Sequence, residues 1–250
     1  MNNNLVLLRH GESKWNFENR FTGWTDIELT INGIGEAKNA GALLADNNIS
    51  IDVIFTSYLK RAIHTKDLCI KQLRNKDIQV YNDWRLNERH YGNLQGLNKS
   101  EVSKKFGEEQ VKIWRRSYDI APPKMKENDK RHPKFDKLYK AINSNDLPNG
   151  ESLKDTLDRV KPLWIDKIFP LIKKGKNLMI VAHGNSLRAI VKMLKKISDN
   201  EIVNLNIPTG TPYVFNMSKD FNIIKDFYLG NIDEISEKME EVAKKHSSNH

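Results

Sequence analysis

The sequence predicts one α/β domain over residues 1–250: a three-layer α/β/α sandwich with a mostly parallel sheet and a helical insertion over one end of it. Two runs of consecutive apolar residues, Leu5 to Leu8 and Leu178 to Ala182, are typical of strands covered on both faces. Segments with the apolar spacing of helices alternate with such runs. A chain of 250 residues is long enough to bury a substantial core in this way.

The first part of the chain is predicted to form a strand, a helix, a second strand and a second helix, in this order. Thr30 is expected to cap a helix that turns Ala37, Ala40 and Leu44 to one side and ends near residues 47–48. Three further elements are expected in this part: a strand over Ile51 to Phe55, a helix over Arg61 to Leu73 and a short strand over Ile78 to Tyr81.

Residues 82–150 differ in character, because they are rich in charge, turn formers and aromatic rings. We interpret them as a long insertion with helical pieces, packed over one end of the sheet. Excursions of this length are commonly functional. For residues 122–136, where Lys, Asp, Asn and Pro dominate, a disordered loop is the competing interpretation.

The last part opens with Ser152 and Asp155, which have the spacing of a capping box at the start of a helix. Pro162 is expected to kink this helix or to divide it in two. Four more elements are expected: a helix over Ser186 to Lys195, edge strands over Tyr213 to Asn216 and Ile223 to Tyr228, and a tail from Asn231 with Ile235, Met239 and Val242 at helical spacing.

The formal net charge of +9 is compatible with a nucleic-acid binder, a membrane-surface protein, an enzyme for polyanionic small molecules, or a lysine-rich solvated surface. One cysteine, Cys69, excludes an internal disulfide and fits a reducing compartment. Leu5 to Leu8, the longest apolar run near the N-terminus, is too short for a signal peptide or a membrane span. A cytoplasmic protein with no membrane partner is therefore expected. No spacing typical of metal ligands is present in the sequence.

His10 and His183 each stand where an apolar strand gives way to glycine. The ends of parallel strands are where α/β proteins bind ligands, and glycine lets the backbone approach an anion. A neutral imidazole can attack phosphorus, while a second imidazole or an arginine neutralises the phosphoryl oxygens. Arg9, His10, Arg61 and His183 are thus candidates for one phosphate pocket. The alternative is that the histidines are hydrogen-bonded structural residues.

Arg9-His10-Gly11-Glu12 matches the RHGE signature of the histidine phosphatase superfamily, and His183-Gly184-Asn185-Ser186 resembles its second half. Longer stretches resemble the phosphoglycerate mutases that depend on 2,3-bisphosphoglycerate, and the resemblance runs from about residue 4 to about residue 240. These stretches are Leu8 to Trp24, Leu86 to Lys99, Arg115 to Asp119, Ala182 to Arg188 and Ile207 to Gly210.

The resemblance implies a phosphohistidine enzyme that interconverts 3-phosphoglycerate and 2-phosphoglycerate, a step of glycolysis and gluconeogenesis, after priming by 2,3-bisphosphoglycerate. It implies His10 as the nucleophile and Glu88 as the general acid and base. His183, Arg9 and Arg61 would stabilise the transferring group. The family also implies homo-oligomers, dimers or tetramers, and no metal. Related activities that use the same residues, bisphosphoglycerate synthase or phosphatase, remain alternatives, as does a catalytically idle phosphate- or nucleic-acid-binding module.

The resemblance also implies the substrate ligands. Arg115 and Arg116 would diverge by about 100° on a helix, so both can serve only if the ligand lies between them or their stems bend inward. In relatives the C-terminal segment folds over the entrance, a part that Lys238, Lys244 and Lys245 are candidates to play. The implied ligands are Ser13, Asn16, Thr22, Gly23, Arg89, Tyr91, Lys99, Arg115, Arg116, Gly184 and Asn185.

The remaining histidines are not assigned to the site. His64 is expected to be a packing residue, and His90 is expected to point away from Glu88 if its segment is extended. His132, His246 and His250 are expected to be exposed.

Overall fold

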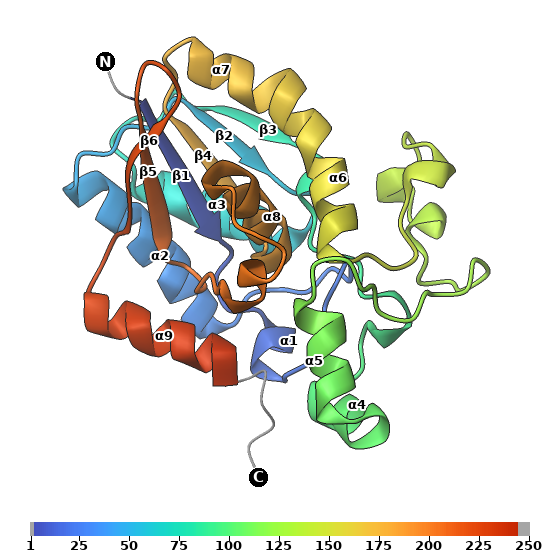
Figure 1. Cartoon of the computed structure of the whole chain (residues 1–250). Helices are drawn as coiled ribbons and strands as arrows, with labels where there is room; N and C mark the ends of the chain where they lie inside the picture. Colours follow the sequence, from blue (N-terminus) through green and yellow to red (C-terminus); the bar gives the residue numbers. More distant parts are fainter. Residues whose placement is uncertain (1–2, 245–250) are drawn as a thin grey trace.

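The computed structural model describes residues 3–244 and confirms the three-layer sandwich, with helices on both faces of a six-stranded sheet (Figure 1). The strand order is β3-β2-β4-β1-β5-β6. The first four strands in this order are parallel, β5 is antiparallel to β1, and β6 is antiparallel to β5. The strands are β1 (Asn3–Arg9), β2 (Val53–Thr56), β3 (Gln79–Asn82), β4 (Leu178–Ala182), β5 (Pro212–Met217) and β6 (Ile223–Tyr228).

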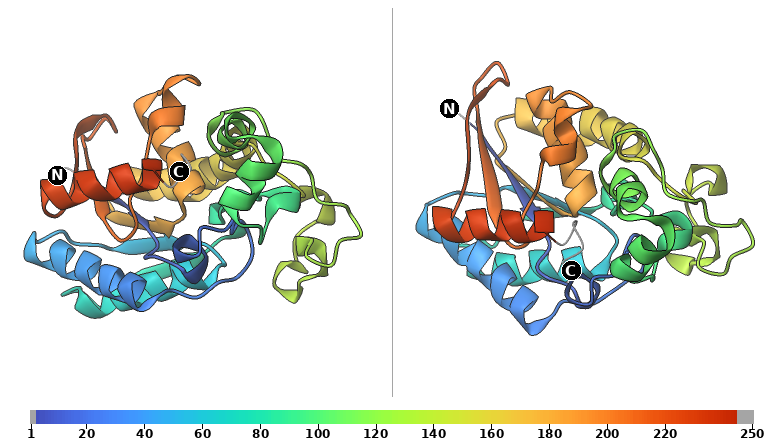
Figure 2. Two further views of the ribbon diagram at one scale, coloured as in Figure 1. Left: turned by 90° about the horizontal axis from the view of Figure 1, so that it is seen from below. Right: turned by 60° about the horizontal axis from the view of Figure 1, so that its bottom comes forward.

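The helices form two layers, and the pair α2 and α3 lies on the opposite face of the sheet from the pair α6 and α8 (Figure 2). The α-helices are α1 (Lys14–Phe17), α2 (Ile31–Asp46), α3 (Lys60–Gln72), α4 (Lys99–Phe106), α5 (Glu108–Arg116), α6 (Leu153–Leu163), α7 (Phe169–Lys173), α8 (Gly184–Lys195) and α9 (Ile232–Lys244).

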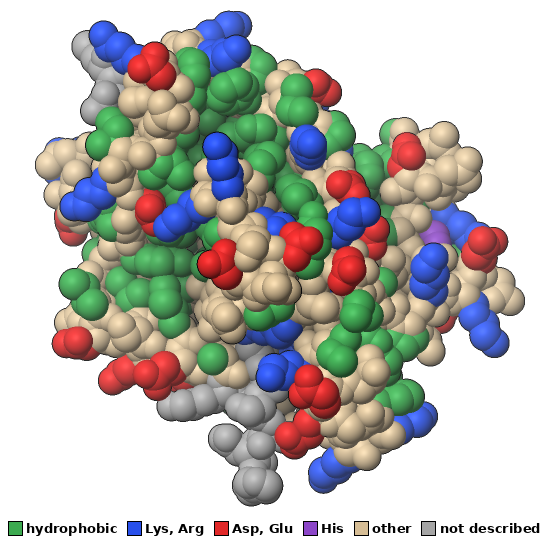
Figure 3. Space-filling view, in the orientation of Figure 1, with side chains coloured by type: hydrophobic (Ala, Val, Ile, Leu, Met, Phe, Trp, Pro, Cys, Tyr) green, Lys and Arg blue, Asp and Glu red, His purple; other side chains and the backbone are tan. Residues whose placement is uncertain are grey.

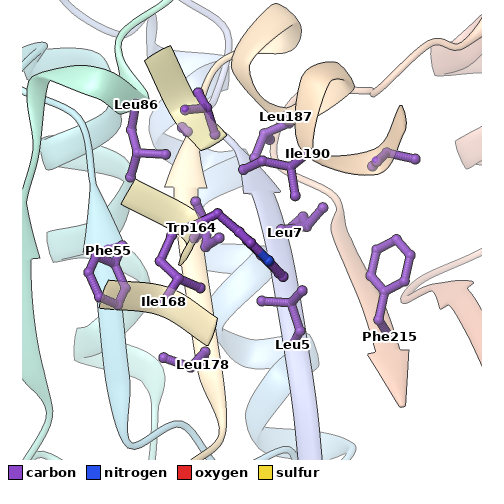
Figure 4. Close-up of a cluster of buried hydrophobic side chains, with 14 of the residues drawn as sticks. Leu5, Leu7, Phe55, Leu86, Trp164, Ile168, Leu178, Leu187, Ile190 and Phe215 are labelled. Atoms are coloured by element: carbon purple, nitrogen blue, oxygen red, sulfur yellow. The ribbon is translucent and has the colours of Figure 1, made fainter. Parts of the chain in front are cut away.

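Consecutive apolar residues become strands here because each face of the sheet has its own core. Leu5 and Leu7 point to one face, where they pack with Trp164 and with residues of α8 (Figure 4). Val6 and Leu8 point to the other, against α2 and α3. All four side chains have no exposed surface. Successive side chains of a strand point to opposite faces of the sheet, and because both faces are buried here, neither face requires polar residues.

The predicted helix starts are confirmed. The Thr30 side chain accepts a hydrogen bond from the backbone N–H of Gly33, and Ser152 and Asp155 form the reciprocal capping box. α6 ends at Leu163, immediately after Pro162, and a π-helical turn joins it to α7. Pro162 therefore lies next to the π-helical turn between α6 and α7, and the residues at both junctions of that turn keep helical dihedral angles.

One strand assignment was wrong. β5 was expected at an edge of the sheet, yet it is paired on both sides, with β1 and with β6. The reason is that β5 and β6 form an antiparallel pair, so the second strand of the pair takes the outer position. The true edges are β6 and β3.

Residues 82–150 lie beyond one end of the sheet, to the right in Figure 1. Backbone hydrogen bonds tie residues 122–136 to neighbouring segments: Asn93 N–H donates to Pro123 O, and Met125 N–H donates to Asn149 O. The expected exposure of His132 was wrong, because this side chain is only 5 % exposed and its Nδ1 accepts from the backbone N–H of Lys134. It caps a short 3₁₀ turn, Pro133–Phe135, which turns the ring inward.

α9 lies across the end of the sheet at which β1 and β4 end, next to the site described below (Figure 1). Lys238 Nζ lies 3.1 Å from Glu36 Oε1 on α2, and Val242 reaches the pocket described below. The sequence analysis also made predictions for Lys245, His246 and His250. These residues lie outside the described part of the chain. None of the helices within residues 3–244 is long and apolar enough to cross a membrane.

Candidate active site

Strand pairing brings the two histidines together. Arg9 of β1 lies opposite Ala182 of β4, so the next residues, His10 and His183, leave the sheet side by side. Their ring centroids are 5.0 Å apart, and the backbone N–H of His10 donates to Ala182 O. β2 flanks β4 on its other side and delivers Ser57, whose Oγ lies 2.7 Å from His183 Nε2.

His10 has the protonation pattern of a nucleophile. Its Nδ1 lies 2.7 Å from the carbonyl oxygen of Gly11, an acceptor, so Nδ1 carries the proton. Nε2 keeps its lone pair, toward which the Nε–H of Arg61 points at 3.3 Å. Burial lowers the pKa of His10 well below its ordinary value, and the charges of Arg61 and Arg9 lower it further. The ring is therefore neutral at physiological pH.

Arg61 is fixed beside His10 by two backbone carbonyls. Its Nη1 donates to Thr25 O at 2.9 Å and its Nη2 to Gly23 O at 2.8 Å. Gly23 has a positive φ of 53°, and a Cβ at this position would lie 2.0 Å from Gln95 Oε1. Only glycine fits, so the loop after His10 holds the Arg61 guanidinium through the shape of its backbone.

The His183 ring packs against the ring of His10 and is fully buried. Ser57 Oγ accepts from the backbone N–H of Leu59, so the hydroxyl can donate its own proton to His183 Nε2. The ring then carries its proton on Nδ1, which is buried and has no hydrogen-bond partner among residues 3–244. Burial, followed by the charge of Arg61, lowers the pKa of His183 well below its ordinary value. His183 is thus a neutral ring beside a neutral nucleophile, and in the tautomer that accepts from Ser57 its donor is Nδ1–H.

Glu88 brings a carboxylate to this cluster from the start of the insertion. Its Oε1 accepts from the backbone N–H of Arg89 at 2.7 Å and of Asn185, in the first turn of α8, at 3.1 Å. A Cβ at Gly184 would lie 3.6 Å from Glu88 Oε2 and 3.5 Å from Arg9 Cζ. The Glu88 carboxylate and the Arg9 guanidinium thus both lie beside Gly184, within van der Waals contact of the space that a Cβ would occupy.

Arginine side chains, buried or half-buried, complete the pocket. Arg115 and Arg116, adjacent on α5, both line it, and Arg116 also donates to Leu205 O and Asn206 Oδ1. Burial lowers the pKa of Arg115 to about 10. Burial, then the charges of Arg188 and Arg115, lowers the pKa of Arg116 to about 8. Cations held this way gain stability when an anion arrives.

Most of the predicted site residues meet in this pocket. His183 does not line it, because this residue is fully buried against His10. Ser13 does not line it either: its Oγ donates to Asn16 Oδ1 at 2.9 Å and caps α1. Arg89 lies behind Tyr91, donating to its hydroxyl and to Arg115 O. The predicted residues that line the pocket are Arg9, His10, Asn16, Thr22, Gly23, Arg61, Glu88, Tyr91, Lys99, Arg115, Arg116, Gly184 and Asn185.

Sequence reasoning missed several residues of the site. Arg188 lines the pocket one turn after Asn185 on α8, and its Nη1 donates to Asn185 Oδ1 at 2.8 Å. Its i, i+3 relation to Asn185 was the available signal. Ser57 had a weaker signal, since it follows a predicted strand. Arg20 and Asn206 also line the pocket. Arg20 lies within the family-like stretch Leu8 to Trp24, and Asn206 directly precedes the stretch Ile207 to Gly210.

The fold and the paired histidines define a class of protein. The sequence profile of the histidine phosphatase superfamily (branch 1) matches residues 5–131 and 123–229. Among solved structures, a mycobacterial glucosyl-3-phosphoglycerate phosphatase superposes with a TM-score of 0.68 at 23% identity, over 90% of this chain and 97% of that one. The alpha-ribazole phosphatase from Shigella flexneri has a TM-score of 0.64 at 22% identity, over 89% and 94%. At such identities the likeness shows the fold. The chain belongs to the histidine phosphatase superfamily.

Relatives of higher sequence identity indicate a family within this superfamily. A protein of Bacteroides thetaiotaomicron named 2,3-bisphosphoglycerate-dependent phosphoglycerate mutase 2 is 54% identical over 239 residues, 96% of each chain. Proteins named 2,3-bisphosphoglycerate-dependent phosphoglycerate mutase from Bacteroides fragilis and Treponema denticola are 55% and 50% identical over 96% of this chain, and over 96% and 97% of their own lengths. Within the superfamily, the chain belongs to the family of 2,3-bisphosphoglycerate-dependent phosphoglycerate mutases.

Proposed function

We propose that this chain interconverts 3-phosphoglycerate and 2-phosphoglycerate through a phosphohistidine at His10. One observation carries the proposal: a buried neutral imidazole, with its Nε2 lone pair beside Arg61, lies next to a second imidazole in a pocket lined by arginines. The near-full-length relatives named as phosphoglycerate mutases support it.

The chemistry follows from the contacts. His10 Nε2 forms a bond to phosphorus while the bond from phosphorus to the donor oxygen breaks. Arg9, Arg61 and the Nδ1–H of His183 meet the charge on the phosphoryl oxygens. Glu88 gives its proton to the departing substrate oxygen and takes a proton from the substrate hydroxyl in the return transfer.

The substrate carries a phosphate of roughly −1.5 to −2 charge together with a carboxylate. Arg115, Arg116 and Lys99, which line the pocket, are proposed to bind the groups that do not react. 2,3-Bisphosphoglycerate is proposed as the primer, because it offers one phosphate to His10 and a second one to these cations. The resting enzyme would then be phosphorylated on His10.

Further properties belong to the same proposal: a cytoplasmic, metal-independent enzyme that forms homo-oligomers and binds neither nucleic acid nor membrane. Lys and Arg side chains on the face in Figure 3 are scattered among Asp and Glu, which supports a solvated surface rather than a binding stripe. Self-association is supported by β3, an edge strand of four exposed residues.

The direct test is a phosphoglycerate mutase assay with and without added 2,3-bisphosphoglycerate, with the synthase and phosphatase rates measured on the same preparation. We expect mutase turnover that depends on the primer and exceeds the other two rates. A phosphatase rate above the mutase rate would identify a related enzyme instead. Salt-sensitive RNA binding without turnover would support the binding-module alternative.

The covalent intermediate has its own test. Labelled 2,3-bisphosphoglycerate should leave an acid-labile, base-stable phosphate that maps to His10. Label on serine, or none, would count against the mechanism.

A further inference from the structure

A buried ion pair lies behind the segment that carries Glu88. Arg159 of α6 and Glu151, just before that helix, are 2.6 Å apart between Nε and Oε1, and their side chains are 8 % and 4 % exposed. Neither residue lines the pocket around His10. No step of the proposed reaction uses them, although desolvating two charges is costly.

The guanidinium of Arg159 also binds the main-chain carbonyl of Glu88 and two carbonyls that precede it. Nη1 donates to Arg85 O, and Nη2 donates to Asn87 O at 3.0 Å and to Glu88 O at 2.9 Å. A planar guanidinium presents its donors in a fixed fork. Because Nε and Nη2 are also bonded to Glu151, the orientation of this fork is set.

Glu151 fixes the other end of the segment. Its Oε2 accepts from the backbone N–H of His90 at 2.7 Å, and its own N–H donates to His90 O at 2.8 Å. The indole Nε1–H of Trp24 also donates to Glu88 O, at 2.6 Å, and Arg159 Cζ lies 5.6 Å from the Trp24 ring centre. The main chain from residue 85 to residue 90 is thus held at both ends and at Glu88 itself.

We propose that Arg159 and Glu151 are positioning residues that set the place of the Glu88 carboxylate for proton transfer. The inference rests on the proposed function, in which Glu88 is the general acid and base. A catalytic carboxyl must lie within hydrogen-bond reach of the oxygen it protonates, and a displacement of about 1 Å can cost about 100-fold in rate. The carboxylate moves with its backbone, and this ion pair holds that backbone.

Two phosphoryl donors separate positioning from general structural support. With 2,3-bisphosphoglycerate, the phosphorus–oxygen bond breaks as the His10 Nε2–phosphorus bond forms, and the glycerate oxygen takes a proton from Glu88. With acetyl phosphate the same bond to His10 forms, but acetate leaves as a stable anion and needs no proton. Only the first reaction depends on where the Glu88 carboxyl lies.

The experiment measures single-turnover phosphorylation of His10 by each labelled donor. Arg159→Lys keeps the charge and loses the fork, while Glu151→Gln loses the charge. Arg85→Lys is the matched control, because Arg85 pairs with Asp83 and its side chain does not touch Glu88. Both rates come from one preparation, so their ratio does not depend on how much of a variant folds. Glu88→Gln serves as the reference for loss of the acid.

We expect Arg159→Lys and Glu151→Gln to slow transfer from 2,3-bisphosphoglycerate by about 10- to 100-fold, and transfer from acetyl phosphate by less than about 3-fold. Arg85→Lys should leave the ratio unchanged. Suppose that Glu88→Gln slows transfer from 2,3-bisphosphoglycerate more than transfer from acetyl phosphate. Equal losses with both donors in Arg159→Lys and Glu151→Gln, or no loss, would then overturn the positioning role and leave the proposed function intact. If Glu88→Gln itself treats both donors alike, the acid–base assignment in the proposed function fails instead.

Discussion

Lowering the pH from 7.5 to 5.5 should destabilise the protein, because three histidines are buried in their neutral form. Burial lowers the pKa of His10 and of His183 well below 6.5. Burial, then the charges of His132 and Arg159, lowers the pKa of His90 to about 3. Each ring is at most 2 % exposed at the residue level, so solvent screening is slight.

The sign follows from proton counting. In the unfolded chain these histidines bind protons below about pH 6.5, while in the native state they do not, so the free energy of unfolding falls as the pH drops. Each ring contributes RT ln(1 + 10^(6.5 − pH)), which is about 1.4 kcal/mol at pH 5.5. Three rings give about 4 kcal/mol, a large part of a typical stability of about 5–15 kcal/mol.

Equilibrium unfolding in urea at pH 7.5, 6.5 and 5.5 would measure the loss, in buffers without phosphate or sulfate, since these anions would occupy the arginine pocket. His90→Asn is the diagnostic variant, because Asn can still accept the N–H of Gly92 that His90 Nδ1 accepts at 3.0 Å. Its loss between pH 7.5 and 5.5 should be smaller by about one third. Asp129 does not titrate between pH 7.5 and 5.5, because its hydrogen bonds to Arg131 lower its pKa to about 2. Equal stability at the three pH values, or an unchanged slope in His90→Asn, would refute the reasoning.

Four further outcomes are expected. His10→Ala should abolish mutase turnover in the standard assay, and substantial residual turnover would refute the nucleophile assignment. Arg188→Gln should raise the KM for phosphoglycerate about 10-fold or more, since a charge-assisted contact contributes about 1.5–3 kcal/mol; an unchanged KM would remove Arg188 from the binding surface. 2,3-Bisphosphoglycerate at about 100 times its Kd should add about 2.7 kcal/mol to the free energy of unfolding, and no increase in thermal midpoint would contradict binding to the folded state. EDTA should leave turnover intact, whereas a strong loss would reveal a metal requirement.

Much of the fold could be predicted from the sequence because its signals are local. The run Leu178 to Ala182 is a strand with the bounds expected, and the caps at Thr30 and Ser152 form within three residues of themselves. The strand-end histidines, with the motifs around them, likewise identified the candidate chemistry. Periodicity, capping and turn chemistry depend on neighbours along the chain, which a sequence displays directly.

Only the tertiary structure decided which strand ends meet. Pairing of β1 with β4 places His10 beside His183, and pairing of β4 with β2 brings Ser57 to the other side. The interior position of β5, the burial of His132 and the fork of Arg159 under Glu88 were equally hidden. Each depends on contacts between residues far apart in the chain. Such contacts form only when the whole sheet and its two cores assemble, because no single segment can bury its apolar face or satisfy its hydrogen bonds alone.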